Sequence, residues 1–284
     1  MPIFSLAGRG GIGTFGKEAY RFVDFLKKAK QSYWQILPLN PTNYGDSPYQ
    51  SFSSFAGNPY FIDPELLIED GLLTESEFLS FDFGDDPYKI DYGKLYESRT
   101  KMLKIAFSKF KETADFKTFC SKNAYWLNDY CLFMALKNAN DDTAWTEWQD
   151  DLRFRKPEAI AKAKSDYSDT IKFYCFVQYL FYKQWFELKS YANKNKIKII
   201  GDIPIYVAYD SADVWCDTKQ FQLDKNLYPK AVAGCPPDAF SDDGQLWGNP
   251  LYDWKFMKSE NYAWWKRRLR HILSLYDTVR IDHF

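Results

Sequence analysis

The residues of this chain that could do chemistry concentrate at its end, in the strand-like segment 278–284. Side chains alternate between the two faces of a strand, so Arg280 and Asp282 share one face and lie about 6.6 Å apart. A parallel strand is normally buried on both faces, where an unpaired charge is costly. The two residues therefore form a structural ion pair or a site. We favour a site, because apolar residues often serve stability as well and a nearby guanidinium keeps a nucleophilic carboxylate ionised by lowering its pKa.

A second carboxylate, Asp202, follows the apolar run 197–200 and Gly201. By itself this residue could equally cap a turn. Two carboxylates at strand ends that face one opening are what glycosyl transfer through an oxocarbenium-like transition state requires. The two strand ends together therefore favour chemistry on sugars.

The loop 234–250 is the third candidate, because it interleaves amides, an acid and aromatic rings. Amide and carboxylate side chains offer paired donors and acceptors for vicinal hydroxyls, and aromatic rings offer faces on which sugars stack. The candidate ligand-binding residues are Asp238, Phe240, Gln245, Trp247 and Asn249. The alternative is an Ω-like loop that its own side chains hold rigid.

The elements that must position these residues alternate between helices and short apolar strands. We expect a strand at 33–37, another near 60–63, one at 197–202 and the last at 278–284. Apolar periodicity predicts helices over 18–30, 96–111, 115–137, 168–193 and 259–276, the last capped by Ser259. This alternation indicates parallel βα units, in an α/β barrel or a doubly wound sheet. The glycine cluster 8–16 follows no convincing strand, and we expect it to be a flexible N-terminal loop.

Composition excludes some classes of protein. Lys and Arg total 37 against 38 Asp and Glu, for a net charge of −1, which argues against a nucleic-acid binder. The five cysteines show no CxxC spacing and there are two histidines, so a Cys/His metal site is improbable. Neither a signal peptide nor a membrane-spanning stretch is visible. We therefore expect a cytoplasmic protein with free thiols and without a metal.

Four blocks of this sequence resemble one family, the 4-α-glucanotransferases or amylomaltases of glycoside hydrolase family 77. The blocks occur in the family's order and with similar spacing across residues 8–284. They are Ser47-Pro48-Tyr49-Gln50 with Ala56-Gly57-Asn58-Pro59, Gly201 to Val207 with Asp210 to Trp215, the loop from Pro236 to Pro250, and Val279-Arg280-Ile281-Asp282-His283-Phe284.

The resemblance implies a (β/α)8 barrel and a retaining double displacement on α-1,4-glucans, with no cofactor. Asp282 matches the nucleophile, Arg280 the arginine beside it, and Asp202 the acid of the donor subsite. Tyr49 would stack near the cleavage point. The loop residues named above and His283 would contact maltooligosaccharides or the glucan chains of amylose and glycogen.

The resemblance also implies that part of the barrel lies elsewhere. Residues 1–63 and 193–284 would form about four βα units of eight, and 64–192 a mainly helical insertion. The family's acid/base glutamate and a further aspartate belong to later strands, so we expect the 284 residues alone to be inactive. Ala239 stands where relatives often have tyrosine. An α-glucan hydrolase of the same clan and a non-catalytic glucan-binding protein remain alternatives, and no oligomeric state is predicted.

Overall fold

A parallel sheet of three strands organises the part of the chain that the computed structural model describes, residues 1–86, 88–239 and 241–282. Its strand order is β1-β2-β5, with β1 at Tyr33–Gln35, β2 at Lys198–Pro204 and β5 at Thr278–Asp282. Helices separate these strands along the chain. The mixed α/β fold with a parallel sheet is therefore confirmed.

The central strand β2 is tightly packed on the face that carries Ile199, Gly201 and Ile203. Ile199 and Ile203 are buried. At Gly201, a Cβ atom would lie 2.2 Å from the ring of Tyr276, so only glycine lets this ring pack against the strand. Strand and helix approach each other closely just before the candidate carboxylate Asp202.

The prediction of a strand near 60–63 is wrong. This segment forms the 3-10 helix η3, Pro59–Phe61, followed by α2, Pro64–Glu69. Asn58 accepts a hydrogen bond from the amide of Tyr60, and Asp63 accepts one from the amide of Leu66. Two prolines without N–H groups and two capping side chains favour helical turns over a sheet ladder. The described sheet accordingly has three parallel strands, one fewer than the four units expected.

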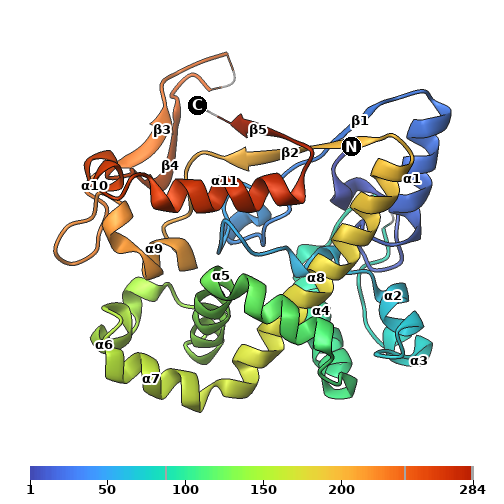
Figure 1. The fold of residues 1–284 in the computed structure, drawn as a ribbon, viewed down its shortest axis with the longest axis horizontal. Coiled ribbons are helices and arrows are strands. Elements are labelled where there is room, and N and C mark those ends of the chain that lie inside the picture. Colours follow the sequence, from blue (N-terminus) through green and yellow to red (C-terminus); the bar gives the residue numbers. More distant parts are fainter. Residues whose placement is uncertain (87, 240, 283–284) are drawn as a thin grey trace.

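The helices predicted before β2 are confirmed. In the view of Figure 1, those of residues 92–194 extend below the sheet, whereas the helix of residues 17–28 stands to its right. The longest two, α5 (Ala114–Ala139) and α8 (Ser168–Lys194), pack against each other, and α8 runs diagonally up to the sheet. Trp145, Trp148 and Trp185 are buried packing residues, as predicted. The other helical elements of this half are η1 Ile3–Ser5, α1 Lys17–Lys28, η2 Tyr44–Asp46, α3 Glu75–Leu79, α4 Tyr92–Lys109, η4 Trp145–Glu147, α6 Asp150–Arg153 and α7 Pro157–Asp166.

Between β2 and β5 the chain forms more structure than a long loop. It contains an antiparallel hairpin of β3, Val232–Cys235, and β4, Gln245–Pro250. The expected helix 259–276 is two helices, because Asn261 and Tyr262 both have a φ of 54° and interrupt it. Ser259 is the last residue of the first of them, where its hydroxyl donates to the carbonyl of Phe256 at 2.7 Å, so the expected N-cap role is wrong. The helical elements here are α9 Ala212–Cys216, η5 Thr218–Gln220, α10 Trp254–Ser259 and α11 Ala263–Leu275.

The glycine-rich N-terminal segment is packed, so the expected flexible loop is wrong. Phe15 is fully buried, and Arg99 donates to the carbonyl of Gly10 at 2.9 Å. One cluster of buried apolar side chains connects this segment, the sheet and the helices of residues 64–192. None of the helices in the described ranges has an apolar stretch long enough to cross a bilayer.

Candidate active site

Two neighbouring strands place a carboxylate and a guanidinium side by side. Asp202 on β2 lies opposite Arg280 on β5, and Nη1 of Arg280 is 3.0 Å from both carboxylate oxygens. The hydroxyl of Tyr49, from the loop after β1, donates to Oδ2 of Asp202 at 2.8 Å. The side chain of Asp202 is 1% exposed and that of Arg280 is 48% exposed. Three strand ends therefore converge on one buried carboxylate.

This pairing differs from the one that the sequence suggested. We expected Arg280 to act on Asp282, its neighbour on the same strand face. The structure instead joins Arg280 to Asp202 across the sheet, because adjacent strands lie about 4.8 Å apart, closer than two positions along one strand. The structure describes the backbone of Asp282, which lies in β5 opposite Pro204. The contact of Arg280 with Asp202 does not exclude one with Asp282, and the expected Arg280–Asp282 contact stays a prediction.

The loop after β1 is held against the hairpin by Gln50. Its Nε2 donates to Oδ1 of Asn249 at 3.0 Å and to the carbonyl oxygen of Trp247 at 3.2 Å. The backbone of the loop is closed by Asn43, whose N–H donates to the carbonyl of Gln50 at 3.0 Å. Tyr49 is thus fixed between the strand end and the hairpin.

A cleft of about 490 Å³ lies between the loop after β1, the end of β2 and the hairpin. Predicted residues Tyr49, Gln245, Trp247 and Asn249 all line it. The indole N–H of Trp247 donates to Oε1 of Gln245 at 2.9 Å, so the ring is held by its own strand. The cleft offers an aromatic face beside amide groups, and Tyr49 connects it to the buried Asp202.

Asp238 is not among the residues that line this cleft. It is exposed and accepts a hydrogen bond from the amide of Ser241 at 3.0 Å, which is a turn-capping role. Phe240 and His283 lie outside the described residues. The predicted loop residues that line the cleft are those of the strand β4, and their binding of a sugar stays a prediction.

Tyr206 is a cleft residue that the sequence reasoning missed. Its ring stacks on that of Tyr252 at a centroid distance of 5.9 Å and lies 6.5 Å from that of Trp247. Burial raises the pKa of the Tyr252 phenol, which stays neutral and donates to the carbonyl of Ile205 at 2.6 Å. Arg268 binds the same carbonyl at 3.0 Å. The available signal was an aromatic residue two positions after the strand that carries Asp202.

Comparison with known proteins identifies the family. A family model described as 4-alpha-glucanotransferase matches residues 1–284. The chain belongs to this family. The 4-alpha-glucanotransferase of Clostridium butyricum is 52% identical over 287 residues, which cover 100% of this chain and 59% of that relative. The 4-alpha-glucanotransferase of Thermus thermophilus is 48% identical over 286 residues, covering 99% and 56%.

Solved structures agree with the assignment to the 4-alpha-glucanotransferase family. An amylomaltase from Streptococcus agalactiae, in complex with acarbose, has a TM-score of 0.96 and 47% identity, covering 100% of this chain and 58% of that one. The amylomaltase from Corynebacterium glutamicum has a TM-score of 0.75 at 19% identity, which is a likeness of fold. The chain thus spans less than two thirds of the length of these relatives.

Proposed function

We propose that the whole protein that includes this chain is a 4-alpha-glucanotransferase, which transfers α-1,4-glucan segments between maltooligosaccharides. The observation that carries the proposal is the buried carboxylate of Asp202, held by Arg280 and Tyr49 beside the aromatic cleft of a family member. A carboxylate at a strand end is suited to accept hydrogen bonds from sugar hydroxyls. The acarbose bound by the Streptococcus agalactiae relative supports an α-glucan ligand.

We assign separate roles to the residues of the site. Tyr49 and Trp247 offer rings for sugar faces, and Gln245 and Asn249 offer amides for hydroxyls. Asp238, Phe240 and His283 are assigned to further sugar contacts by family resemblance. These contacts fit maltooligosaccharides and the glucan chains of amylose or glycogen.

Asp282 is the proposed nucleophile of a retaining double displacement. Its carboxylate attacks the anomeric carbon while the bond to the leaving 4-oxygen breaks, and an acid protonates that oxygen. The 4-hydroxyl of an acceptor sugar then attacks the anomeric carbon of the glycosyl-enzyme. The bond to Asp282 breaks and frees its carboxylate, and the proton of the hydroxyl passes to the group that acted as the acid, now a base. Family resemblance assigns this acid and base to a glutamate on a strand later than β5.

The finer architecture follows from the same proposal. The strands β1, β2 and β5 would belong to a (β/α)8 barrel, built here from 1–63 and 193–284, with 64–192 as a helical insertion. All five cysteines are free thiols, which suits the cytoplasm.

The test is a chimera in which residues 1–284 replace the matching part of the Clostridium butyricum relative. We expect it to convert two maltotriose molecules into maltopentaose and glucose, without a rise in total reducing ends. In the chimera, Asp282→Asn should lower kcat by several orders of magnitude, at about 1.4 kcal/mol for each tenfold, while acarbose still binds.

Two results would contradict the proposal. A rise in reducing ends would favour the hydrolase. Binding of maltooligosaccharide without turnover, in a chimera whose parent relative is active, would favour the non-catalytic glucan-binding protein. Full transfer by the Asn variant would remove Asp282 from its role.

A further inference from the structure

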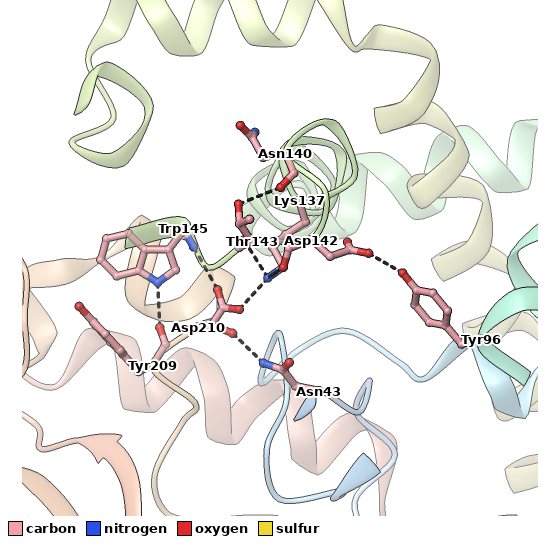
Figure 2. Close-up of polar contacts among 9 residues, drawn as sticks. All are labelled: Asn43, Tyr96, Lys137, Asn140, Asp142, Thr143, Trp145, Tyr209 and Asp210. Atoms are coloured by element: carbon pink, nitrogen blue, oxygen red, sulfur yellow. Dashed lines mark hydrogen bonds and ion pairs between the residues drawn. The ribbon is translucent and has the colours of Figure 1, made fainter. Parts of the chain in front are cut away.

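Lys137, in α5, is a buried cation outside the site described above. Its side chain is 2% exposed, and Nζ lies 2.6 Å from Oδ2 of Asp210. The same Nζ donates to the carbonyl oxygens of Asp142 at 2.8 Å and Thr143 at 3.1 Å (Figure 2). The ring of Phe52 lies beneath the ammonium at 5.2 Å. All three N–H groups of the ammonium are therefore used.

Asp210 connects this cation to the loops that follow two strands of the sheet. It lies in the segment between β2 and α9, and its carbonyl oxygen accepts a hydrogen bond from Nδ2 of Asn43, in the loop after β1, at 3.2 Å (Figure 2). Its Oδ1 accepts from the amide of Trp145 at 3.3 Å, and the indole of Trp145 donates to the carbonyl of Tyr209 at 2.8 Å. The helical half of the chain therefore contacts the loop after β2 directly at Asp210 and, through Asp210, the loop after β1.

The network continues from Asn43 to the cleft. The backbone N–H of Asn43 donates to the carbonyl of Gln50, and the amide of Gln50 donates to Trp247 and Asn249. Tyr49, next to Gln50, donates to Asp202. Contiguous polar contacts therefore run from Lys137 to the three segments that line the cleft.

The cost of burying the Lys137 ammonium also indicates a role beyond the packing of helices. Desolvating an ammonium is expensive, and a well-packed apolar residue often stabilises a core as well or better. A best-attested use of a buried charge is to fix one geometry among several. Lys137 has such a geometry to fix, because two loops from different strands must meet the hairpin in one arrangement.

We propose that Lys137 is a positioning residue for the cleft: through Asp210 and Asn43 it sets the arrangement of the loops that carry Tyr49 and Tyr206. It touches no ligand itself. The proposal concerns the site assigned under the proposed function and rests on that function for its ligand.

The test compares Lys137→Met with Lys183→Met in the chimera of residues 1–284 with the Clostridium butyricum relative. The control removes another ion pair of the helical half, Lys183 with Asp70 at 2.6 Å, whose partners do not line the cleft. Backbone hydrogen exchange is followed by mass spectrometry in peptides covering 40–53, 205–211 and 245–250, and acarbose binding is followed by calorimetry.

We expect Lys137→Met to speed exchange in all three peptides and to weaken acarbose binding about tenfold, within the usual range for coupled sites. The peptide 245–250 decides the matter, since Lys137 does not touch it. Lys183→Met should leave the three peptides and the affinity unchanged. Asp210→Asn, which keeps the backbone carbonyl that Asn43 binds, should reproduce the effect and replaces Lys137→Met if that variant does not fold.

A fall in melting temperature with unchanged exchange in 205–211 and 245–250 would overturn the proposal, because it would show a purely structural role. If the unaltered chimera fails to bind acarbose, the proposed function fails instead. The exchange data would still decide whether Lys137 positions the loops.

Discussion

The bond between Arg280 and Asp202 sets the electrostatics of the site. The carboxylate is buried, whereas the guanidinium is half exposed and reaches it from the neighbouring strand. The exposed partner is screened by water, so the pair contributes less to stability than a fully buried one. The main effect of the pair is on Asp202, whose buried carboxylate would lose its ionic partner without Arg280.

We predict that Arg280→Met destabilises the chain by about 1–3 kcal/mol, the usual penalty for a buried group that loses its partner. The double variant Arg280→Met/Asp202→Asn should recover most of that loss, because the stranded charge is then gone. Urea unfolding of the two single variants, the double variant and the parent chain measures the coupling. Strictly additive free energies would mean that the ion pair contributes nothing.

At this scale Asp202, Trp247 and Asn249 could be selected from the sequence itself, because each lies at a strand end or in a loop of amides and aromatic rings, whereas Tyr49 was selected by family resemblance. It could not reveal the partner of Arg280, since register between strands depends on long-range packing. Lys137 was missed for another reason: a lysine in a long helix is typical of a solvent-exposed face. The sequence does not show that Asp210, far along the chain, lies beside it.

Among the elements, the hairpin β3–β4 depends on glycine. At Gly244 φ is 74°, and a Cβ atom would lie 2.5 Å from the carbonyl oxygen of Cys235. At Gly248 φ is 75°, but a Cβ atom would meet nothing within 4 Å. A residue with a side chain would have a strained backbone at both positions, but only at Gly244 would its Cβ atom also meet a close neighbour.

We predict that Gly248→Ala costs about 1–2 kcal/mol, the strain of a left-handed residue. Gly244→Ala should cost more, because the hairpin must also open to admit the methyl group. Urea midpoints of both variants give the comparison. An equal loss, or a larger one at Gly248, would show that the close contact with Cys235 is relieved easily.

The sequence predicted the long helices α4, α5 and α8 well, because amphipathic periodicity over many residues is a strong local signal. It failed where one or two residues decide the structure. Asn58 and Asp63 turn an apolar run into helical turns, and the backbone of Asn261 and Tyr262 divides one helical pattern in two. Such breaks depend on capping and dihedral angles that apolar periodicity does not reveal.

At the scale of the whole molecule, His271 joins the second half of the chain to the helices. Its Nδ1 accepts from the hydroxyl of Tyr125 on α5 at 3.0 Å, and its Nε2 lies 2.8 Å from the hydroxyl of Tyr182 on α8. Nε2 is also 3.0 Å from the carbonyl of Phe55. Burial lowers the pKa of His271 to about 4, so the ring is neutral at pH 7.

We predict a loss of stability in mild acid that depends on His271. The unfolded chain takes up a proton near the ordinary pKa of 6.5 and the folded chain only near 4, so stability falls as the pH falls between these values. The slope is on the order of 1.4 kcal/mol for each pH unit. Burial raises the pKa values of Asp213 and Asp217, which oppose this trend.

The matched variant is His271→Gln, whose amide can still donate and accept but does not titrate. Urea midpoints at pH 7 and pH 5 should differ less for this variant than for the parent chain. The same pH dependence in both would assign the acid sensitivity to other groups.

The sequence predicted the alternation of helices and parallel strands, and family membership confirms the identity that its motifs suggested. It did not predict how closely the helices of 64–192 join the sheet. Gln178 on α8 exchanges hydrogen bonds with the backbone of Gly57 at 2.7 and 2.9 Å, and one apolar core runs through both parts.

The order of the strands has a kinetic consequence. Tyr33 on β1 lies opposite Lys198 on β2, so more than half of the chain separates two adjacent strands. Bringing such distant segments together carries a loop-closure entropy, and folds rich in distant pairings form slowly. The helices between them form from local contacts, and the packing of α5 on α8 draws the two strands toward each other. We therefore expect the closure of the sheet that carries the catalytic candidates to be the slowest step of folding.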